Sequence, residues 1–460
     1  MGEGHIRYDT VVAGGQAVLP GMGTVRADVG IRDGRIAAVA EELPRQAAAE
    51  VIDARGRYVL PGVIDPHLHF GGGNGDEDFA TETRFAAGGG VTTVLGMLRQ
   101  PKPYDLLFPQ LLDAAEKRAY IDFGFHAVLL IEEHLEALPR YVKELGISSF
   151  KFYISYRAQE PLEPGVKPLD DGFMLEAFQR VASLPDCMVI LHAEDTEITS
   201  RYQRQMQAAG KDGVAAWFAS RPVIAEVEGC RRALYFAEAT GCRITILHLT
   251  SGAALAEIVG HRPRYSNVFV ETCIPYLTHT RETTLGNLIK VKPPLREKAD
   301  NDALWRGLAV GQVNWVGSDN VPRKADTKAG SVWTAAPGVP GTGLILPVIL
   351  SEGVHRGRLS LEQAVQITSA NAARAYNLAP RKGAIQVGAD ADLAIVDMDL
   401  EREVHASELG SNADYSIYEG WKLKGWPVCT ISRGVLVVQD GRLVGSPGHG
   451  RYLPRRGAEE

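Results

Sequence analysis

Short apolar runs recur through the middle of this chain and alternate with segments of helical periodicity. This alternation is typical of a parallel sheet whose strands are joined by crossover helices. We expect eight strands, in the runs VLPGVIDPHLHF, VTTVLGM, FGFHAVLL, SSFKFYI, MVILHAE, ITILHLT, VFVETC and NWVGSD. Helical patterns between them include DLLFPQLLDAAEKRAY, EHLEALPRYVKELG, DGFMLEAFQRVASL and EVEGCRRALYFAEATG. Eight such units predict an α/β protein with a (β/α)8 TIM barrel. A doubly wound open sheet is the alternative, but no G-x-G-x-x-G turn follows any of these strands.

The two ends of the chain have a different pattern, with short alternating strands and glycine turns. Asp33-Gly34 and Asp440-Gly441 each stand between two such runs, and Asp-Gly is a strong hairpin signal. We therefore expect residues 1–55 and 379–445 to form one small β-sandwich domain beside a barrel over 56–378. The run SLEQAVQITSANAARAYNL predicts a helix that leads back to the small domain. Residues 446–460, rich in Gly, Pro and Arg, are expected to be a surface tail or an arm onto a neighbouring subunit.

Composition narrows the class of protein. The chain has 460 residues, of which 45% are hydrophobic, which is enough for a large α/β core. A net charge of -7 argues against nucleic acid or anionic membranes as partners. There is no 18-residue apolar run, and the first residues (MGEGHIRYDT) lack a signal or transit pattern. The five scattered cysteines are expected to be reduced and structural, so we expect a cytoplasmic location.

Polar side chains stand at the ends of several predicted strands. They are His67 and His69 in the first strand, Lys151 in the fourth, His192 in the fifth, His248 in the sixth and Asp319 in the eighth. A buried apolar run accommodates imidazole or carboxylate only where something compensates their burial. The active sites of TIM barrels lie at the carboxyl ends of the strands. The pattern therefore predicts one shared polar site that binds metal.

The histidines differ in how specific their signal is. His67 and His69 are two apart on a strand, so their side chains point to the same face. An HxH pair also occurs by chance in loops, and a single histidine such as His192 or His248 is more often a packed core residue. Their equivalent positions on separate strands favour metal ligands. Asp65 is a partner of these ligands or a turn residue, and the sequence favours the turn slightly.

Lys151 is the most diagnostic residue of the pattern. An ammonium group has no lone pair for a metal. A lysine that is desolvated at the end of an apolar strand can lose its proton, and the neutral amine can then add CO2 to give a carbamate with two oxygens. The alternative is a lysine that extends to solvent. Asp319 is expected to be both a ligand and a proton acceptor, although it or Ser318 would also serve as a helix N-cap.

The order HLH, Lys, His, His and Asp resembles the amidohydrolase superfamily, specifically its dihydropyrimidinase/hydantoinase branch. The similarity extends over almost the whole chain, through PGVIDPHLHF, GGGVTT, FKFYISY, HAED, ETCIPYL, KPPLRE, GSDN and KGAIQVGADADL. The resemblance implies two Zn2+ ions per subunit, bridged by carboxylated Lys151. His67, His69 and Asp319 would hold one ion, and His192 and His248 would hold the other. Tyr156 matches the tyrosine that hydrogen-bonds the oxyanion in this family, although taken alone it would be a packing aromatic.

The resemblance also implies a reaction. A metal-bridging hydroxide would attack a ring amide carbon, and Asp319 would pass the proton to the leaving nitrogen. The partner would be a small cyclic amide such as a hydantoin, dihydropyrimidine or related ureide, and the protein would be a homotetramer or dimer. The alternatives are an allantoinase or another cyclic-imide hydrolase, a non-catalytic scaffold like the collapsin-response mediator proteins, and a mononuclear deaminase that would not need Lys151.

Three positions depart from the family pattern around the substrate. Asn320 stands where the family usually has histidine, and Lys292 replaces a serine whose backbone binds the imide. Pro337 replaces an asparagine that makes another such backbone contact, and proline has no N–H to donate. The sequence therefore leaves open which ring is opened. Phe70-Gly71 follow HLH where dihydroorotases have an arginine, which counts against that activity.

Overall fold

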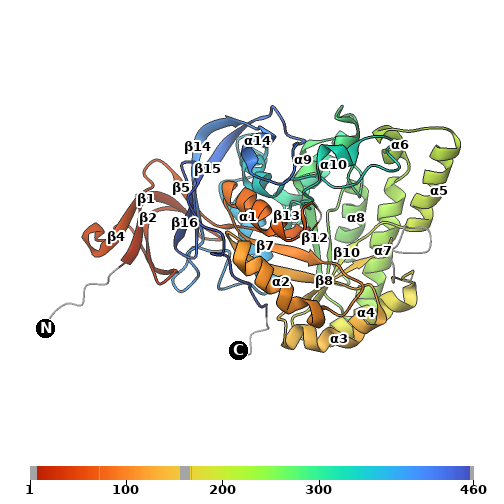
Figure 1. Ribbon diagram of the computed structural model, residues 1–460, viewed down its shortest axis with the longest axis horizontal. Helices are drawn as coiled ribbons and strands as arrows, with labels where there is room; N and C mark the ends of the chain where they lie inside the picture. The colour runs from red at the N-terminus through yellow and green to blue at the C-terminus, as the bar shows by residue number, and fades with distance from the viewer. Residues whose placement is uncertain (1–7, 72, 156–165, 167, 456–460) are drawn as a thin grey trace.

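The computed structural model describes residues 8–71, 73–155, 166 and 168–455, and the described strands form two sheets (Figure 1). One sheet runs in chain order through β6 (Val63–Leu68), β7 (Val91–Leu98), β8 (Asp122–Val128), β9 (Ser149–Tyr153), β10 (Met188–His192), β11 (Ile244–Ile246), β12 (Val268–Cys273) and β13 (Trp315–Gly317). Every neighbouring pair is parallel. Each of these strands coincides with one of the eight predicted runs to within one residue at its ends or lies inside it, so the TIM-barrel prediction is confirmed.

The last strand of the barrel meets the first, so the sheet closes on itself. Leu68 forms a parallel bridge with Asn320, and the His69 N–H donates to the Asn320 carbonyl at 2.9 Å. Strands β7 and β8 are buried along their whole length. Such strands are covered on both faces, which is why they are continuous apolar runs rather than alternating ones.

Helices follow the barrel strands and cover their outer faces (Figure 1). The longer ones are α1 (Asp78–Gly88), α2 (Tyr104–Arg118), α3 (Glu132–Lys143), α4 (Asp171–Ala182), α5 (Thr196–Ala208), α7 (Val223–Thr240), α8 (Gly252–His261) and α10 (Lys298–Ala309). Shorter helices are α6 (Val214–Ala219), α9 (Ile274–Thr278), α11 (Ile345–Val348) and α14 (Ala406–Leu409). The predicted helix after the eighth strand consists of α12 (Leu361–Val365), a π-helical stretch Gln366–Ala370 and α13 (Asn371–Ala375).

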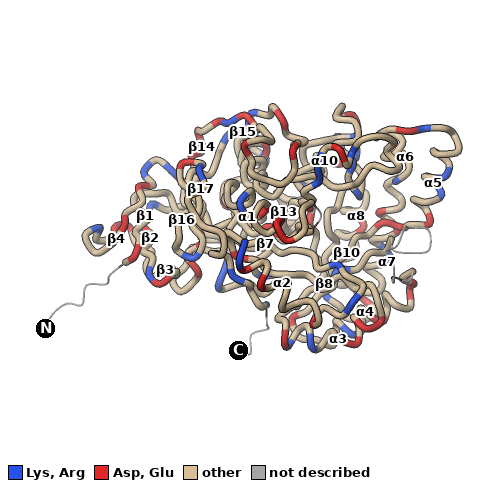
Figure 2. The backbone as a smooth tube through the Cα atoms, viewed as in Figure 1, with Lys and Arg blue, Asp and Glu red and all other residues tan. Residues whose placement is uncertain are grey.

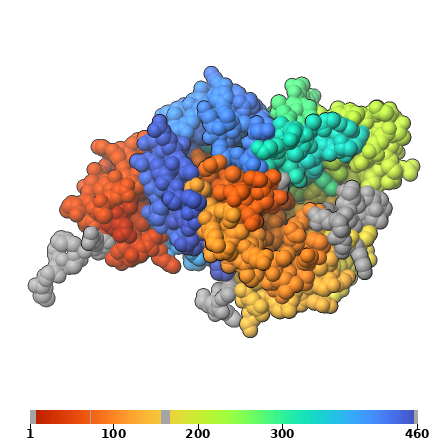
Figure 3. All heavy atoms as spheres, in the orientation of Figure 1, coloured from red at the N-terminus to blue at the C-terminus, as the bar shows by residue number. Residues whose placement is uncertain are grey.

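The second sheet is built from both ends of the chain, as predicted. Its strands are β1 (Tyr8–Leu19), β2 (Gly23–Arg32), β3 (Arg35–Ala40), β4 (Ala48–Asp53), β5 (Tyr58–Pro61), β14 (Leu393–Glu403), β15 (Lys422–Ser432), β16 (Val435–Gln439) and β17 (Arg442–Leu443). β5 joins the two halves, because it pairs with β1 on one side and β14 on the other. Figure 3 shows the N-terminal part (red) packed directly against the C-terminal part (blue).

Both predicted Asp-Gly hairpins are present in this sheet. Asp33 and Gly34 connect β2 to β3 with φ angles of 51° and 73°. Asp440 and Gly441 connect β16 to β17 with φ angles of 50° and 74°. Two successive positive φ angles are the geometry of a type I′ turn, which matches the twist of the strands and favours Asp-Gly.

The expectation of a surface tail is wrong for its described part, residues 446–455. Tyr452 pairs with Phe123 at the start of β8, and the Arg455 side chain is fully buried. Arg455 donates from its backbone to the Gly146 carbonyl at 2.7 Å and from Nη1 to Ser149 Oγ at 2.7 Å. The segment thus packs against the barrel at the amino ends of its strands, opposite the predicted site.

Charged residues lie mainly along the helices and the outer turns (Figure 2). Within the described part of the chain, no helix combines the length and the apolar character needed to cross a membrane. All five cysteines are buried as free thiols.

Candidate active site

The six side chains predicted as ligands come together at the carboxyl ends of the barrel strands. His67 and His69 stand at the end of β6, Lys151 on β9 and His192 at the end of β10. His248 follows β11, and Asp319 follows β13. His248 and Asp319 have φ angles of 38° and 50°, which are unusual for residues with a Cβ. Such conformations cost about 1–3 kcal/mol and cluster at functional sites.

One half of the site is formed by His67, His69 and Asp319. Asp319 Oδ1 lies 3.2 Å from His67 Nε2 and 3.1 Å from His69 Nε2. The two imidazoles reach the same carboxylate because residues two apart on a strand share a face. The donor atoms lie within 4.8 Å of one another, a spacing that suits a single metal ion.

The other half is formed by His192 and His248. His192 Nδ1 and His248 Nε2 face each other at 3.0 Å. The halves are adjacent, because the ring centroids of His67 and His248 are 5.4 Å apart. Burial lowers the pKa of His248 and lowers that of His192 to about 4, although Glu194 opposes the shift for His192. Both imidazoles are therefore neutral at pH 7, the state in which histidine binds a metal.

Two buried carboxylates fix the tautomers of these histidines. Glu271 Oε1 lies 2.7 Å from His67 Nδ1, and Glu194 Oε2 lies 3.0 Å from His192 Nε2. A carboxylate accepts only, so each neutral imidazole donates from the nitrogen that faces it. The lone pair is then on the opposite nitrogen, His67 Nε2 or His192 Nδ1, and points to the centre of the site. His67 Nε2 is buried and faces Asp319 Oδ1 at 3.2 Å without the geometry of a hydrogen bond. This donor set fits a metal ion.

Lys151 is enclosed at the centre of the site, with only 1% of its surface exposed. Its Nζ lies 4.8 Å from the centre of the Tyr153 ring. Burial lowers the pKa of Lys151 to about 8, against the opposing effect of Asp319 and Glu271. The neutral amine is thus far more populated near pH 7 than in an exposed lysine, as addition of CO2 requires. The alternative of a lysine that extends to solvent is wrong.

Asp319 keeps its negative charge in this setting. Burial raises its pKa, but the facing His67, His69 and Lys151 more than offset this and lower it to about 2. An ionised carboxylate whose Oδ1 faces two imidazoles can bind a metal or accept a proton.

Asp65 is not a turn residue. It lies within β6, is fully buried, and accepts hydrogen bonds from the backbone N–H of His67 at 3.2 Å and of Ser318 at 3.1 Å. The Ser318 hydroxyl also donates to it, at 2.5 Å. Asp65 therefore holds the first strand to the last one, next to the predicted ligands on both. Burial raises its pKa to about 6, with these hydrogen bonds opposing the shift.

Glu271 and Glu194 are residues of the candidate site that the sequence interpretation missed. Both carry the signal used for the other residues, a charged side chain at the end of an apolar strand, in VFVETC and ILHAE. Glu271 also accepts from the Trp315 indole at 3.0 Å, and Glu194 pairs with Arg221 at 3.1 Å. Tyr156 lies outside the described residues.

The three departures from the family pattern divide into two kinds. Asn320 is fully buried, donates to Glu82 at 3.0 Å and accepts from the Gly341 N–H at 2.8 Å, so it supports the loops around the site. Lys292 and Pro337 line the pocket itself.

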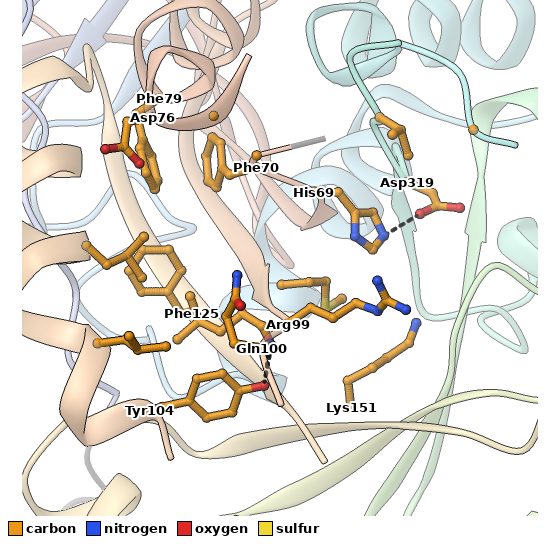
Figure 4. A pocket seen from close by; sticks show the side chains of 18 of the residues that line it. His69, Phe70, Asp76, Phe79, Arg99, Gln100, Tyr104, Phe125, Lys151 and Asp319 are labelled. Carbon is orange, nitrogen blue, oxygen red and sulfur yellow. Dashed lines mark hydrogen bonds and ion pairs between the residues drawn. The ribbon is translucent and has the colours of Figure 1, made fainter. Parts of the chain in front are cut away.

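The site opens into a pocket of about 940 Å³. Five of the predicted ligands line it: His69, Lys151, His192, His248 and Asp319. Figure 4 shows His69, Asp319 and Lys151 on one side of this pocket and Phe79, Phe125 and Tyr104 on the other. The volume is larger than one small ring needs, so the pocket has room for ring substituents.

Comparisons with known proteins find relatives that match almost the whole chain. Residues 311–437 match the family described as "Amidohydrolase family". The chain is 34% identical over 446 residues to a D-hydantoinase of Geobacillus stearothermophilus, and this alignment covers 93% of both proteins. It is 36% identical over 461 residues to an allantoinase of Rubrobacter xylanophilus, which covers 98% of both. The crystal structure of dihydropyrimidinase from Brevibacillus agri NCHU1002 superposes with a TM-score of 0.90 at 30% identity, over 97% of this chain and 98% of that one.

Proposed function

The chain belongs to the hydantoinase-like amidohydrolases, and from this premise we propose that it uses two zinc ions to open the ring of a small cyclic amide. It is a hydrolase of carbon–nitrogen bonds in cyclic amides, the class that D-hydantoinases, allantoinases and dihydropyrimidinases represent. The metal content, the bridging lysine and the individual roles of the residues are the proposal.

In the proposed site each residue has a defined place. His67, His69 and Asp319 hold one ion, and His192 and His248 hold the other. Lys151, carboxylated by CO2, would be a ligand of both. When bound, such a pair of ions supplies a hydroxide near neutral pH and polarises the amide carbonyl under attack.

The protein side chains provide the proton transfer and the orientation. Asp319 accepts the proton of the attacking water and delivers it to the ring nitrogen as the carbon–nitrogen bond breaks. Tyr156 is proposed to donate a hydrogen bond to the developing oxyanion. Glu271 and Glu194 hold His67 and His192 in the tautomers that aim their lone pairs at the ions.

One observation supports this proposal above the others. The lone pairs of His67 and His192 point at one centre that also contains Lys151, a buried amine whose pKa is lowered to about 8. The buried His67 Nε2 faces the Asp319 carboxylate at 3.2 Å without forming a hydrogen bond, and a packed core would not leave it so, since an unsatisfied buried polar group costs about 1–3 kcal/mol.

The test is the variant Lys151→Ala. We expect the zinc content to fall from about two ions per chain to one or fewer. We expect activity to fall about 10³-fold or more, because a catalytic ion provides several kcal/mol of transition-state stabilisation. Added short carboxylic acids should restore part of the zinc and of the activity, because a free carboxylate can take the place of the carbamate. Metal analysis and ring-opening assays on the same samples measure both.

The matched control is Lys117→Ala, an exposed lysine on α2, which should leave both quantities unchanged. The wild-type zinc content separates the alternatives: a mononuclear deaminase would hold one ion and a non-catalytic scaffold none. Two ions in Lys151→Ala without added acid would contradict the carbamate.

Ring identity, location and assembly belong to the same proposal. Relatives of similar identity are named D-hydantoinase and allantoinase, so allantoin and cyclic imides belong in the substrate screen beside hydantoins and dihydropyrimidines.

The five buried free thiols support the proposed cytoplasmic location, where thiols stay reduced. The homotetramer or dimer is proposed from the family resemblance.

A further inference from the structure

The turn that carries Asp319 has an uncommon backbone conformation. Asp319 has a φ angle of 50°, in the left-handed region that a residue with a Cβ keeps only when its surroundings hold it there. The residues on both sides of it are anchored. Before it, the Ser318 hydroxyl donates to Asp65 at 2.5 Å, and after it comes Asn320, which is fully buried. The contacts that hold Asn320 therefore also hold Asp319.

Both backbone groups and both side-chain polar atoms of Asn320 form hydrogen bonds. Its N–H donates to Ser318 Oγ at 3.0 Å, and its carbonyl accepts from the His69 N–H at 2.9 Å. Its side chain donates from Nδ2 to Glu82 Oε2 at 3.0 Å and accepts at Oδ1 from the Gly341 N–H at 2.8 Å. The side chain is thus held at two ends by groups of opposite hydrogen-bonding character.

Glu82, on α1, is a fully buried carboxylate that neutral groups surround. Four groups donate to it: Asn320 Nδ2 at 3.0 Å, the Ser411 hydroxyl at 3.0 Å, the Asn412 N–H at 2.9 Å and the Thr81 hydroxyl at 3.1 Å. Burial raises the pKa of Glu82, and the hydrogen bonds from Asn412, Asn320 and Ser411 oppose this rise. Burying a carboxylate is unfavourable unless such hydrogen bonds compensate it, so Glu82 and its donors hold one another in place.

Two of these donors come from the segment between β14 and β15 of the second sheet. Ser411 and Asn412 lie just after α14 and are more than 300 positions from Glu82 in the sequence. Arg84, also on α1, donates to the neighbouring Gly410 carbonyl at 2.6 Å. Glu82 is therefore bound by this segment on one side and by the turn after β13 on the other, and it fixes one relative to the other.

The charge of Glu82 also determines which way the Asn320 amide faces. A carboxylate only accepts hydrogen bonds, so the NH2 group of Asn320 faces Glu82 and its oxygen faces the Gly341 N–H. The reverse orientation would place oxygen against oxygen at one end and donor against donor at the other. The pair therefore specifies a single position for Asn320 and for the turn that precedes it.

We propose that Glu82 is a positioning residue of the ring-opening reaction, which acts through Asn320 to hold the Asp319 carboxylate opposite His67 and His69. This inference rests on the proposed function, in which Asp319 is a metal ligand and moves the proton. It also gives a specific partner to Asn320, one of the departures from the family pattern.

The variant Glu82→Gln of the zinc-loaded full-length enzyme tests this position. The glutamine has the same shape, but its NH2 group must face either the Asn320 NH2 group or the Asn412 N–H, so a donor meets a donor. We expect kcat to fall about 100-fold, the effect of misplacing a reacting group by about 1 Å, while KM changes little. In competition with a chelator, one zinc ion should bind about 10–100-fold more weakly and the other should bind as in the wild type, because Asp319 belongs to only one half of the site.

The double variant Glu82→Gln/Asn320→Asp exchanges the two functional groups of the pair. The NH2 group at position 82 then donates to the carboxylate at position 320, which still accepts from the Gly341 N–H, while the oxygen at position 82 accepts from the Asn412 N–H. Asn320→Asp alone places two carboxylates face to face and should lower kcat at least as much as Glu82→Gln does. The double variant should recover kcat and zinc affinity to within about tenfold of the wild type, since residues in contact have non-additive effects.

The control is Glu77→Gln, just before α1, where an exposed glutamate pairs with Arg118 at 3.0 Å. It should leave kcat and the affinities of both ions unchanged. Wild-type kcat in Glu82→Gln, equal weakening of both ions, or a double variant no better than the worse single variant would overturn the inference. If Glu82→Gln does not fold, as circular dichroism shows, the double variant decides. Near wild-type kcat then supports the pairing, and an unfolded or inactive double variant overturns it.

Failure of the inference and failure of the proposed function are distinguishable. If the wild type binds two zinc ions and opens rings while Glu82→Gln behaves in the same way, the function stands and the positioning role is rejected. If the wild type neither binds zinc nor opens a ring, the function is rejected, and crystal structures of the wild type and the variants decide the inference. An Asp319 carboxylate displaced by about 1 Å in Glu82→Gln and restored in the double variant supports it, and an unmoved carboxylate overturns it.

Discussion

At the scale of single residues, the site depends on carboxylates that aim imidazoles. The six proposed ligands were predictable because each lies at or near the end of an apolar strand, where the cost of burying a polar side chain must be compensated. Their partners were harder to predict. Glu271 and His67 are 204 positions apart and meet only because the closed barrel brings β12 near β6. The sequence around Asp65 also fits a turn. Only the structure shows that Asp65 is buried and accepts a hydrogen bond from the Ser318 backbone N–H.

The variant Glu271→Gln tests the importance of this orientation. Glutamine has the same shape but no charge, and its amide can face His67 with either its oxygen or its NH2 group, so the histidine tautomer is no longer fixed. We expect zinc affinity to fall about 10–100-fold, the usual effect of losing such a partner. Competition with a chelator measures it. The control is Glu257→Gln on α8, where Glu257 forms a partly exposed ion pair with Arg231 of α7. Zinc affinity within twofold of the wild type in Glu271→Gln would contradict the assignment.

At the scale of elements, the sequence was sufficient to predict the strands and turns that local patterns determine. The eight strands and the two Asp-Gly hairpins follow from apolar runs and turn chemistry that any short window of sequence displays. The segment 446–455 has no such periodicity. Its place is determined by contacts with distant parts of the chain: Tyr452 stacks on Phe125 with ring centroids 5.7 Å apart, and its hydroxyl donates to the Leu145 carbonyl at 2.6 Å. Composition alone therefore predicted a tail.

The variant Tyr452→Ala tests whether this segment is part of the folded barrel. Removing the ring leaves a space beside Phe108, Phe123 and Phe125 and leaves the Leu145 carbonyl without this donor. We expect the free energy of unfolding to fall by about 2–4 kcal/mol, at or somewhat below the range for buried aromatics because Tyr452 is only half-buried. Denaturant unfolding measures it. Tyr235→Ala, at an exposed position of α7, should change it by less than about 0.5 kcal/mol. Equal effects of the two variants would show that the segment adds no stability.

At the scale of the whole molecule, a buried ionic cluster joins the barrel to the small domain. Lys382 Nζ lies 2.6 Å from Asp122 at the start of β8, 2.6 Å from Asp392 just before β14 and 3.0 Å from Asp390. Arg433, after β15, also pairs with Asp122 at 2.9 Å. The two-domain plan was predictable from the hydrophobic pattern at the two ends of the chain. The cluster was not, because its members come from three distant segments that become neighbours only after both sheets have formed.

The variant Lys382→Met would leave buried carboxylates without their central cation. Breaking a buried pair in this way costs about 3–5 kcal/mol, so we expect the free energy of unfolding at pH 8 to fall by about that amount. The deficit should shrink at lower pH. Burial already raises the pKa of Asp392 against the opposing effect of Lys382, and without the lysine this pKa rises further. Asp392 therefore takes up a proton in the folded variant as the pH falls, and its unpaired charge disappears. Denaturant unfolding at pH 8 and pH 5 measures the change. Lys424→Met removes a lysine of β15 whose ion pair with Asp399 is exposed, and it should cost no more than about 1 kcal/mol at either pH. A deficit in Lys382→Met that is small, or that grows toward pH 5, would show that the cluster does not hold the two domains together by charge.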